Sequence, residues 1–178
     1  MKLPPQEAQQ FLDAYKPLLE YVYFENYGKY AESINEYKDA KDLLFENFNF
    51  LEKYLAINED LSEKQKEIIL SLKNSLTGTF IYIKTLKKYS LLLDPETNEI
   101  YCVLGLNDSL KELGLYNYSI IETTIIEYNK LVFCDGLISS KNISIGSSFR
   151  SDVNELYKSK KENKKLKKQI TSRFTGPA

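Results

Sequence analysis

The chain has 178 residues and no histidine, which excludes serine–histidine and cysteine–histidine catalysis and removes the commonest neutral-pH acid/base and metal ligand. Two cysteines without a histidine cannot complete a tetrahedral zinc site, and we expect no cofactor. The net charge of −1 conceals two opposite parts. Residues 158–173 carry eight basic residues and one acid, whereas residues 1–157 carry sixteen basic and twenty-four acidic residues.

A first helix is predicted near the N-terminus. Pro4 and Pro5 can occupy its first turn, where amide hydrogens lack partners, and apolar residues then recur at spacings of three and four as far as Val22. Pro17 should kink or split this helix, and Gly28 should end it. The spacing indicates a helix with one face against a core.

Further helices are expected before the middle of the chain. Apolar residues return to one face from Asp39 to about Ile57, which indicates a second helix. Ser62 and Gln65, three residues apart, form a capping box, and the helix that they begin should continue to Gly78. The part of the chain before the first expected strand is therefore interpreted as helical.

From Gly78 to Ile138 short apolar runs alternate with turn residues, a pattern typical of antiparallel strands. Cys102 and Cys134 lie inside these runs, where a thiol usually serves as a small hydrophobe in a reducing compartment, so a cytoplasmic location is expected. Without long crossovers, the strands suggest a meander or small barrel. The expected strands are residues 79–86, 89–93, 99–104, 119–127 and 130–138.

The last two of these strands should form a hairpin with Tyr128 and Asn129 at the turn. That register places Glu122 opposite Asp135, and two adjacent carboxylates cost energy unless a cation, a metal or a shared proton compensates. Such a pair is the one candidate for acid/base or divalent-metal chemistry. The alternative is that the strands diverge or a bulge intervenes, which leaves two solvated acids.

A last helix is predicted to begin near Ser148, to bury Phe149, Val153, Leu156 and Tyr157, and to continue into a lysine-rich end. The expected fold is α+β: N-terminal helices (1–77), a five-stranded antiparallel sheet (78–147) and a long C-terminal helix with a basic tail (148–178), packed as one compact domain.

The basic tail could contact nucleic-acid phosphates or an acidic protein surface, or it could be a solvated helix end. Its basic residues are Lys158, Lys160, Lys161, Lys164, Lys165, Lys167, Lys168 and Arg173.

Three segments resemble an uncharacterised group of bacterial proteins. They are VLGLNDSLKEL (103–113), IETTIIEYNKLVFCDGLISS (121–140) and SIGSSFRSDVNELY (144–157), and residues 46–89 are similar to the segment that precedes the sheet in that group. Some members also carry a cysteine-rich zinc motif called SEC-C, which this chain lacks. The resemblance implies the α+β layout and supplies no activity and no catalytic residue.

Tyrosines crowd the N-terminal third of the chain, and tyrosine is enriched at protein interfaces because it combines a large contact area with a polar end. Tyr23, Tyr27 and Tyr30 are the candidates for an interface. The alternative is that these tyrosines are half-buried around a small core.

The function hypothesis is a non-enzymatic cytosolic protein that binds another macromolecule as an adaptor, regulator or inhibitor. A phage or mobile-element inhibitor of a bacterial defence enzyme would fit this profile. The expected partner is a protein, and no membrane partner is expected because no apolar run approaches the length of about 20 residues that spans a bilayer. Nucleic-acid binding through the tail and a carboxylate- or metal-dependent enzyme remain the alternatives.

Overall fold

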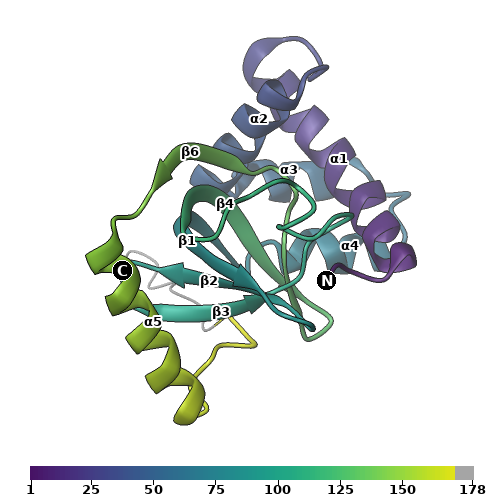
Figure 1. Cartoon of the computed structure of the whole chain (residues 1–178). Helices are drawn as coiled ribbons and strands as arrows, with labels where there is room; N and C mark the ends of the chain where they lie inside the picture. Colours follow the sequence, from purple (N-terminus) through teal and green to yellow (C-terminus); the bar gives the residue numbers. More distant parts are fainter. Residues whose placement is uncertain (171–178) are drawn as a thin grey trace, which may run out of the picture. The chain divides into compact units, whose positions relative to one another are not determined.

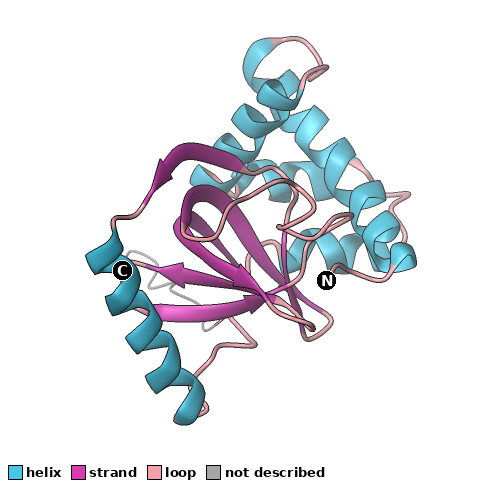
Figure 2. Ribbon diagram, viewed as in Figure 1, coloured by secondary structure: helices cyan, strands magenta, loops and turns pink. Residues whose placement is uncertain are grey.

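The computed structural model describes residues 1–170, without the side chains of residues 142 and 144. The chain divides into two compact units: Pro4–Lys73, and Met1–Leu3 together with the chain from Asn74 onward. Helices alone build the first unit, and strands with one helix build the second (Figure 2). We call them the helical unit and the barrel unit. The predicted boundary after residue 77 falls inside a strand of the barrel unit.

The helical unit begins with α1 (Pro5–Tyr27), which has proline in its first turn as expected. Pro17 lies inside α1, and the helix continues through it as one element, so the predicted split does not occur. Gly28 ends the helix in the left-handed conformation with φ of 70°, and its N–H donates to the Phe24 carbonyl at 2.8 Å.

Three shorter helices follow: α2 (Ile34–Glu46), α3 (Asn49–Ile57) and α4 (Glu63–Ser71). The single helix predicted from Asp39 to about Ile57 is wrong, because Asn47 adopts an extended conformation and separates α2 from α3. The capping box is confirmed, since the Ser62 hydroxyl accepts from the Gln65 N–H and the Gln65 side chain accepts from the Ser62 N–H. However, α4 ends at Ser71 and does not reach Gly78.

The core of the helical unit lies where the apolar stripe of α1 meets the other helices. Removing these side chains from water supplies the main stabilisation of the unit, at about 1.5 to 3 kcal/mol for each fully buried large residue. Almost fully buried are Phe11, Leu18, Leu19, Val22, Leu44, Leu51, Ile68, Ile69 and Leu72.

The barrel unit contains one antiparallel sheet, so the α+β fold class is confirmed (Figure 1). Its strands are β1 (Ser75–Thr85), β2 (Ser90–Asp94), β3 (Glu99–Val103), β4 (Ser119–Tyr128), β5 (Leu131–Cys134) and β6 (Ser139–Ser144). The order is β3-β2-β1-β4-β5, with β6 also paired to β4, so the sheet is not a simple meander. The first five correspond to the predicted strands, and β6 was not predicted as a separate strand.

The sheet curls until its two ends meet at Leu104, directly after β3. The Leu104 N–H donates to the Val132 carbonyl and the Cys134 N–H donates to the Leu104 carbonyl, both at 2.9 Å. Leu104 and Phe133 therefore form a parallel bridge between the end of β3 and β5. This closure makes the sheet a small, partly open barrel.

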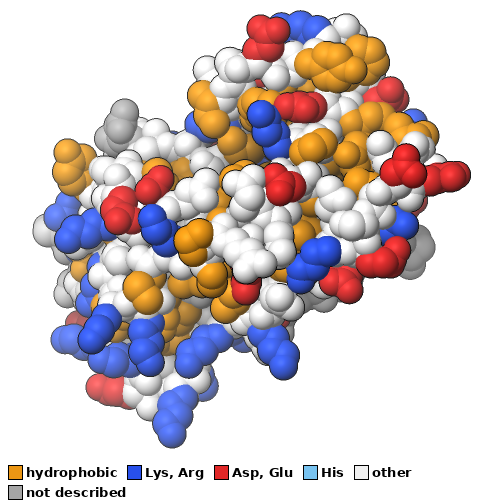
Figure 3. Space-filling model, turned by 90° about the vertical axis from the view of Figure 1, so that its right-hand side faces the viewer, with side chains coloured by type: hydrophobic (Ala, Val, Ile, Leu, Met, Phe, Trp, Pro, Cys, Tyr) orange, Lys and Arg blue, Asp and Glu red, His pale blue; other side chains and the backbone are white. Residues whose placement is uncertain are grey.

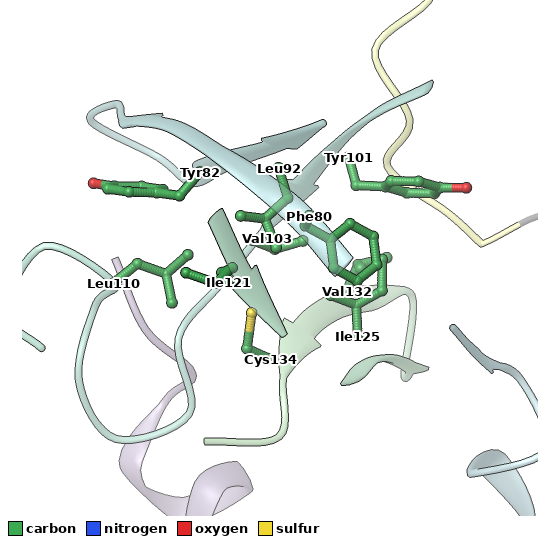
Figure 4. Close-up of a cluster of buried hydrophobic side chains, with 10 residues drawn as sticks. All are labelled: Phe80, Tyr82, Leu92, Tyr101, Val103, Leu110, Ile121, Ile125, Val132 and Cys134. Atoms are coloured by element: carbon green, nitrogen blue, oxygen red, sulfur yellow. The ribbon is translucent and has the colours of Figure 1, made fainter. Parts of the chain in front are cut away.

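Apolar side chains occupy both faces of the sheet. The inner cluster contains Phe80, Tyr82, Leu92, Tyr101, Val103, Leu110, Ile121, Ile125, Val132 and Cys134 (Figure 4). Leu110 comes from the segment between β3 and β4, and Tyr82 and Tyr101 lie on opposite sides of the cluster in Figure 4. The outer cluster joins β1, β2 and β3 to the last helix. Because the two clusters cover both faces of β2, every residue of its run SLLLD is buried.

The last helix, α5 (Ser147–Glu162), lies beside the sheet (Figure 1). Val153 and Tyr157 are buried as predicted, but Phe149 is 45% exposed. The C-terminal helix is shorter than expected: α5 ends at Glu162, before Lys164, which has a positive φ of 54°.

After α5 the chain turns back onto the sheet. The Lys167 N–H donates to the Ile100 carbonyl and the Cys102 N–H donates to the Lys167 carbonyl, both at 2.8 Å. Leu166 packs against the outer cluster and Ile170 against the inner cluster. We call residues 164–170 the docked tail. Among the described residues, no helix has the length and apolar character needed to cross a membrane.

Candidate functional site

The predicted carboxylate pair does not form, because the β4–β5 hairpin has a different register. Tyr128 pairs with Leu131, and the two-residue turn is Asn129 and Lys130, which both have positive φ. Asp135 is therefore two residues along β4 from its predicted partner Glu122: its N–H donates to the Thr124 carbonyl at 3.0 Å.

Glu122 and Asp135 are not paired. Glu122 pairs with Ser139 of β6, and the Asp135 carboxylate accepts from the Thr123 hydroxyl at 3.3 Å. Glu122 instead contacts Lys141, with 2.7 Å between its carboxylate oxygen and Nζ. The prediction of side-by-side carboxylates is wrong, and the enzyme hypothesis loses its geometric basis.

Asp135 has a structural position. It is 2% exposed and also accepts the Leu137 N–H at 3.1 Å, at the interruption between β5 and β6. Here the pairing partner of β4 changes from β5 to β6, and the Asp135 carboxylate accepts hydrogen bonds from a backbone N–H and a side-chain hydroxyl.

The thiols are also poor candidates for chemistry. Both cysteines are buried, and burial raises the pKa of each thiol. The negative charge of Asp135 raises the pKa of Cys134 further. Among the described residues, no group of three or more histidine, cysteine or acidic side chains is placed to hold a metal ion.

Exposed apolar side chains gather where α1 turns into α2. Phe24, Tyr27, Tyr30 and Ile34, which we call the aromatic corner, are 40%, 51%, 63% and 59% exposed. The Phe24 and Tyr30 rings stack with centroids 4.9 Å apart. The upper part of Figure 3, at the height of the turn between α1 and α2 in Figure 1, shows hydrophobic side chains gathered on the surface. Large aromatic side chains exposed together are a typical feature of interaction sites.

Local hydrogen bonds hold the aromatic corner in one conformation. Ser33 and Glu36 form a capping box at the start of α2, and Glu36 also accepts the Glu32 N–H at 2.9 Å and the Lys29 ammonium at 2.7 Å. Together, mainly through Lys29, these donors lower the pKa of Glu36 to about 2. The corner is a capped turn, not a loose loop, which reduces the entropy lost on binding.

The predicted interface residues divide into two groups. Tyr27 and Tyr30 are exposed, whereas Tyr23 is 5% exposed and its hydroxyl donates to Glu36 at 3.3 Å, so Tyr23 belongs to the support of the corner. Sequence reasoning missed Phe24 and Ile34. The available signal was that Phe24 lies off the apolar stripe of α1, where a large apolar side chain must face solvent.

The basic tail is an ordered part of the barrel unit as far as residue 170. Lys160, in α5, pairs with Glu99 at 2.9 Å and thereby joins the helix to β3. Lys158, Lys161, Lys164, Lys165 and Lys168 are exposed, and Lys167 is half-buried. Arg173 lies outside the described residues.

OB-folds are five-stranded, partly open barrels that bind oligonucleotides on the face of their second and third strands. In this chain the outer face of β2 and β3 packs against α5 through Val153 and Tyr157. That face is therefore covered.

Comparison with protein-family models, with curated proteins and with solved structures finds no match to this chain. The resemblance to a bacterial group therefore stays a prediction.

Proposed function

We propose that this protein acts by binding another protein through the aromatic corner of its helical unit. The observation that carries the proposal is the exposure of Phe24, Tyr27, Tyr30 and Ile34 on a turn fixed by its own caps. Binding by such a surface suits an adaptor, regulator or inhibitor, because none of these roles needs a reacting group.

Energetic considerations favour this surface. Aromatic residues are over-represented among interface positions whose truncation costs about 2 kcal/mol or more, and the energy concentrates where such residues cluster. Tyr30 is supported by Phe24 from one side, so the ring is presented with little side-chain freedom left to lose.

The charge of the helical unit indicates the chemistry of the partner. The unit contains eight basic and fourteen acidic residues, a net charge of −6. The Lys29 ammonium, which this total includes, is paired with Glu36 at 2.7 Å. The partner that fits is a protein with an apolar pocket and a basic rim, because complementary charge raises the association rate and rejects acidic surfaces.

The test compares two double variants in affinity capture from source cells treated with nuclease. Tyr27→Ala with Tyr30→Ala should lose a protein that the wild type retains. Leu113→Ala with Tyr116→Ala, which truncates exposed residues of the barrel unit, should retain it.

The captured protein, once purified, gives the quantitative result by calorimetry. The corner variant should bind about 30-fold more weakly, which corresponds to about 2 kcal/mol, and the barrel variant should bind like the wild type. Both variants should unfold at the wild-type temperature, because the truncated side chains are exposed. Equal affinity of the two variants would refute the aromatic corner as the binding surface.

A further inference from the structure

The docked tail displays lysines from a fixed backbone. Its Lys167 is held between Ile100 and Cys102 by two backbone hydrogen bonds, and Leu166 and Ile170 anchor it to the two apolar clusters. Lysines on this segment therefore have defined positions relative to those of α5 and of the β4–β5 turn.

These lysines surround a hollow that is lined without a carboxylate. Lys130, Lys167 and Lys168, together with Leu166 and Gln169, line a hollow of about 350 Å³. Lys130 comes from the β4–β5 turn, whereas the other two come from the docked tail, so folding brings together charges that are distant in sequence.

The surrounding lysines are not neutralised within the described part of the chain. Among residues 1–170, no ion pair involves Lys130 or any of the lysines at positions 158, 161, 164, 165, 167 and 168. The barrel unit contains sixteen basic and eleven acidic residues, a net charge of +5. Figure 3 shows lysine and arginine side chains crowding the lower part of the view.

Clustered positive charges repel one another, and an anion with regularly spaced charges removes this repulsion. The lysine ammonium is a point charge that can bind phosphate oxygens. A row of phosphates also gains free energy by releasing counterions at each neutralised position. The ligand that fits best is a nucleic acid.

Among the described residues, the aromatic ring that Lys161 contacts is not available to stack on bases. The nearby aromatic residue Tyr157 is buried beneath Lys84 and Lys161, whose ammonium groups lie 4.6 and 6.0 Å from its ring centroid. Single-strand binding relies on exposed aromatic rings for base stacking, worth about 1 to 3 kcal/mol per base. A duplex offers about one charge per 1.7 Å of helix axis and needs no stacking.

The geometry points to a second binding site on this protein: the lysines of α5, the docked tail and the β4–β5 turn bind the phosphate backbone of duplex nucleic acid without sequence preference. This site lies on the barrel unit and is independent of the protein interface proposed for the helical unit.

Fluorescence anisotropy with a labelled duplex of about 20 base pairs, and with its single strand, tests the site in about 50 mM salt. The full chain should bind the duplex more tightly than the single strand, and log affinity should fall with log salt at a slope steeper than about −3. Lys164→Gln, Lys165→Gln and Lys168→Gln combined should weaken binding about tenfold or more. The matched control, Lys16→Gln, Lys53→Gln and Lys73→Gln on exposed positions of the helical unit, should leave it unchanged.

A further variant tests whether the folded surface binds the duplex, or whether the lysine-rich segment alone does so. Lys130→Gln should reduce the magnitude of the salt slope by about 1, although Lys130 is remote in sequence from the tail. Unfolding temperatures of all variants should equal that of the wild type. The proposal is overturned if the duplex does not bind at about 50 mM salt, or if the control triple variant weakens binding as much as the tail variant. It is also overturned if polyglutamate competes as well as duplex at equal charge, because that result would indicate an acidic protein partner.

Discussion

Detaching the docked tail should destabilise the barrel unit measurably. The perturbation is Leu166→Ala combined with Ile170→Ala, which removes the two apolar anchors and leaves every lysine in place. Because Leu166 packs on the outer cluster and Ile170 on the inner one, the two substitutions share no partner and their effects should add.

The magnitude follows from the buried carbon atoms. Each substitution removes about three carbons, worth about 0.8 kcal/mol apiece when fully buried. Both side chains are only partly buried, so we expect about 1.5 kcal/mol each and about 3 kcal/mol together. For a unit of this size the unfolding temperature should fall by about 12 °C, at about 4 °C per kcal/mol.

Two assays check this result. Thermal unfolding gives the total loss, and native-state hydrogen exchange at the Cys102 amide, which donates to the Lys167 carbonyl, reports the tail contact itself. The control Leu113→Ala, at a 46% exposed position, should change stability by less than about 0.5 kcal/mol. Unchanged protection of Cys102 and an unchanged unfolding temperature in the double variant would refute the docked tail.

Three further predictions concern ionisable and reactive groups. Because the pKa of Glu36 is lowered, its contribution to stability is complete above its ordinary pKa of 4.5 and is lost as the pH falls towards 2. The difference in unfolding temperature between the wild type and Glu36→Gln should therefore disappear across that pH range. Asp135→Ala should cost about 2 to 4 kcal/mol by leaving buried donors unpaired, whereas Asp135→Asn, which keeps an acceptor oxygen, should cost less than half as much; equal losses in chemical denaturation would contradict this role. Because burial raises the pKa of Cys102 and Cys134, alkylation by iodoacetamide at pH 8 should be slow until denaturant is added, and rapid labelling of the native protein would contradict their burial.

The sequence was sufficient to predict the fold class because its local signals agree with the structure. Alternating apolar runs and the turn at Asp94–Asn98 define the β2–β3 hairpin, and Ser62 with Gln65 defines the start of α4. Both Cys102 and Cys134 are buried in or beside strands as their apolar neighbours indicate. Such features depend on residues close together in the chain.

The hairpin register was missed because the turn has an unusual composition. A type I′ turn needs positive φ at two successive residues, and glycine normally occupies the second position. Here Asn129 and Lys130 adopt φ of 55° and 63°. Only the preference of asparagine was visible in the sequence, and it was placed second instead of first, which produced the incorrect pairing of Glu122 with Asp135.

The docked tail was missed because its signal is sparse and non-local. Leu166 and Ile170 are four residues apart among lysines, a pattern that resembles a frayed helix end. Their partners lie in strands far earlier in the chain, and the pairing of Lys167 with Ile100 and Cys102 cannot be deduced from neighbouring residues. The closure of the barrel at Leu104 was hidden for the same reason.

Hydrogen–deuterium exchange of the complex with the captured protein tests the proposed function most directly. We expect slower exchange in residues 24–34 when the partner is bound, and unchanged exchange in the barrel unit. The amides of the aromatic corner are the ones that a partner seated on Phe24, Tyr27, Tyr30 and Ile34 would shield from solvent. Slower exchange confined to the barrel unit, with residues 24–34 unaffected, would contradict it.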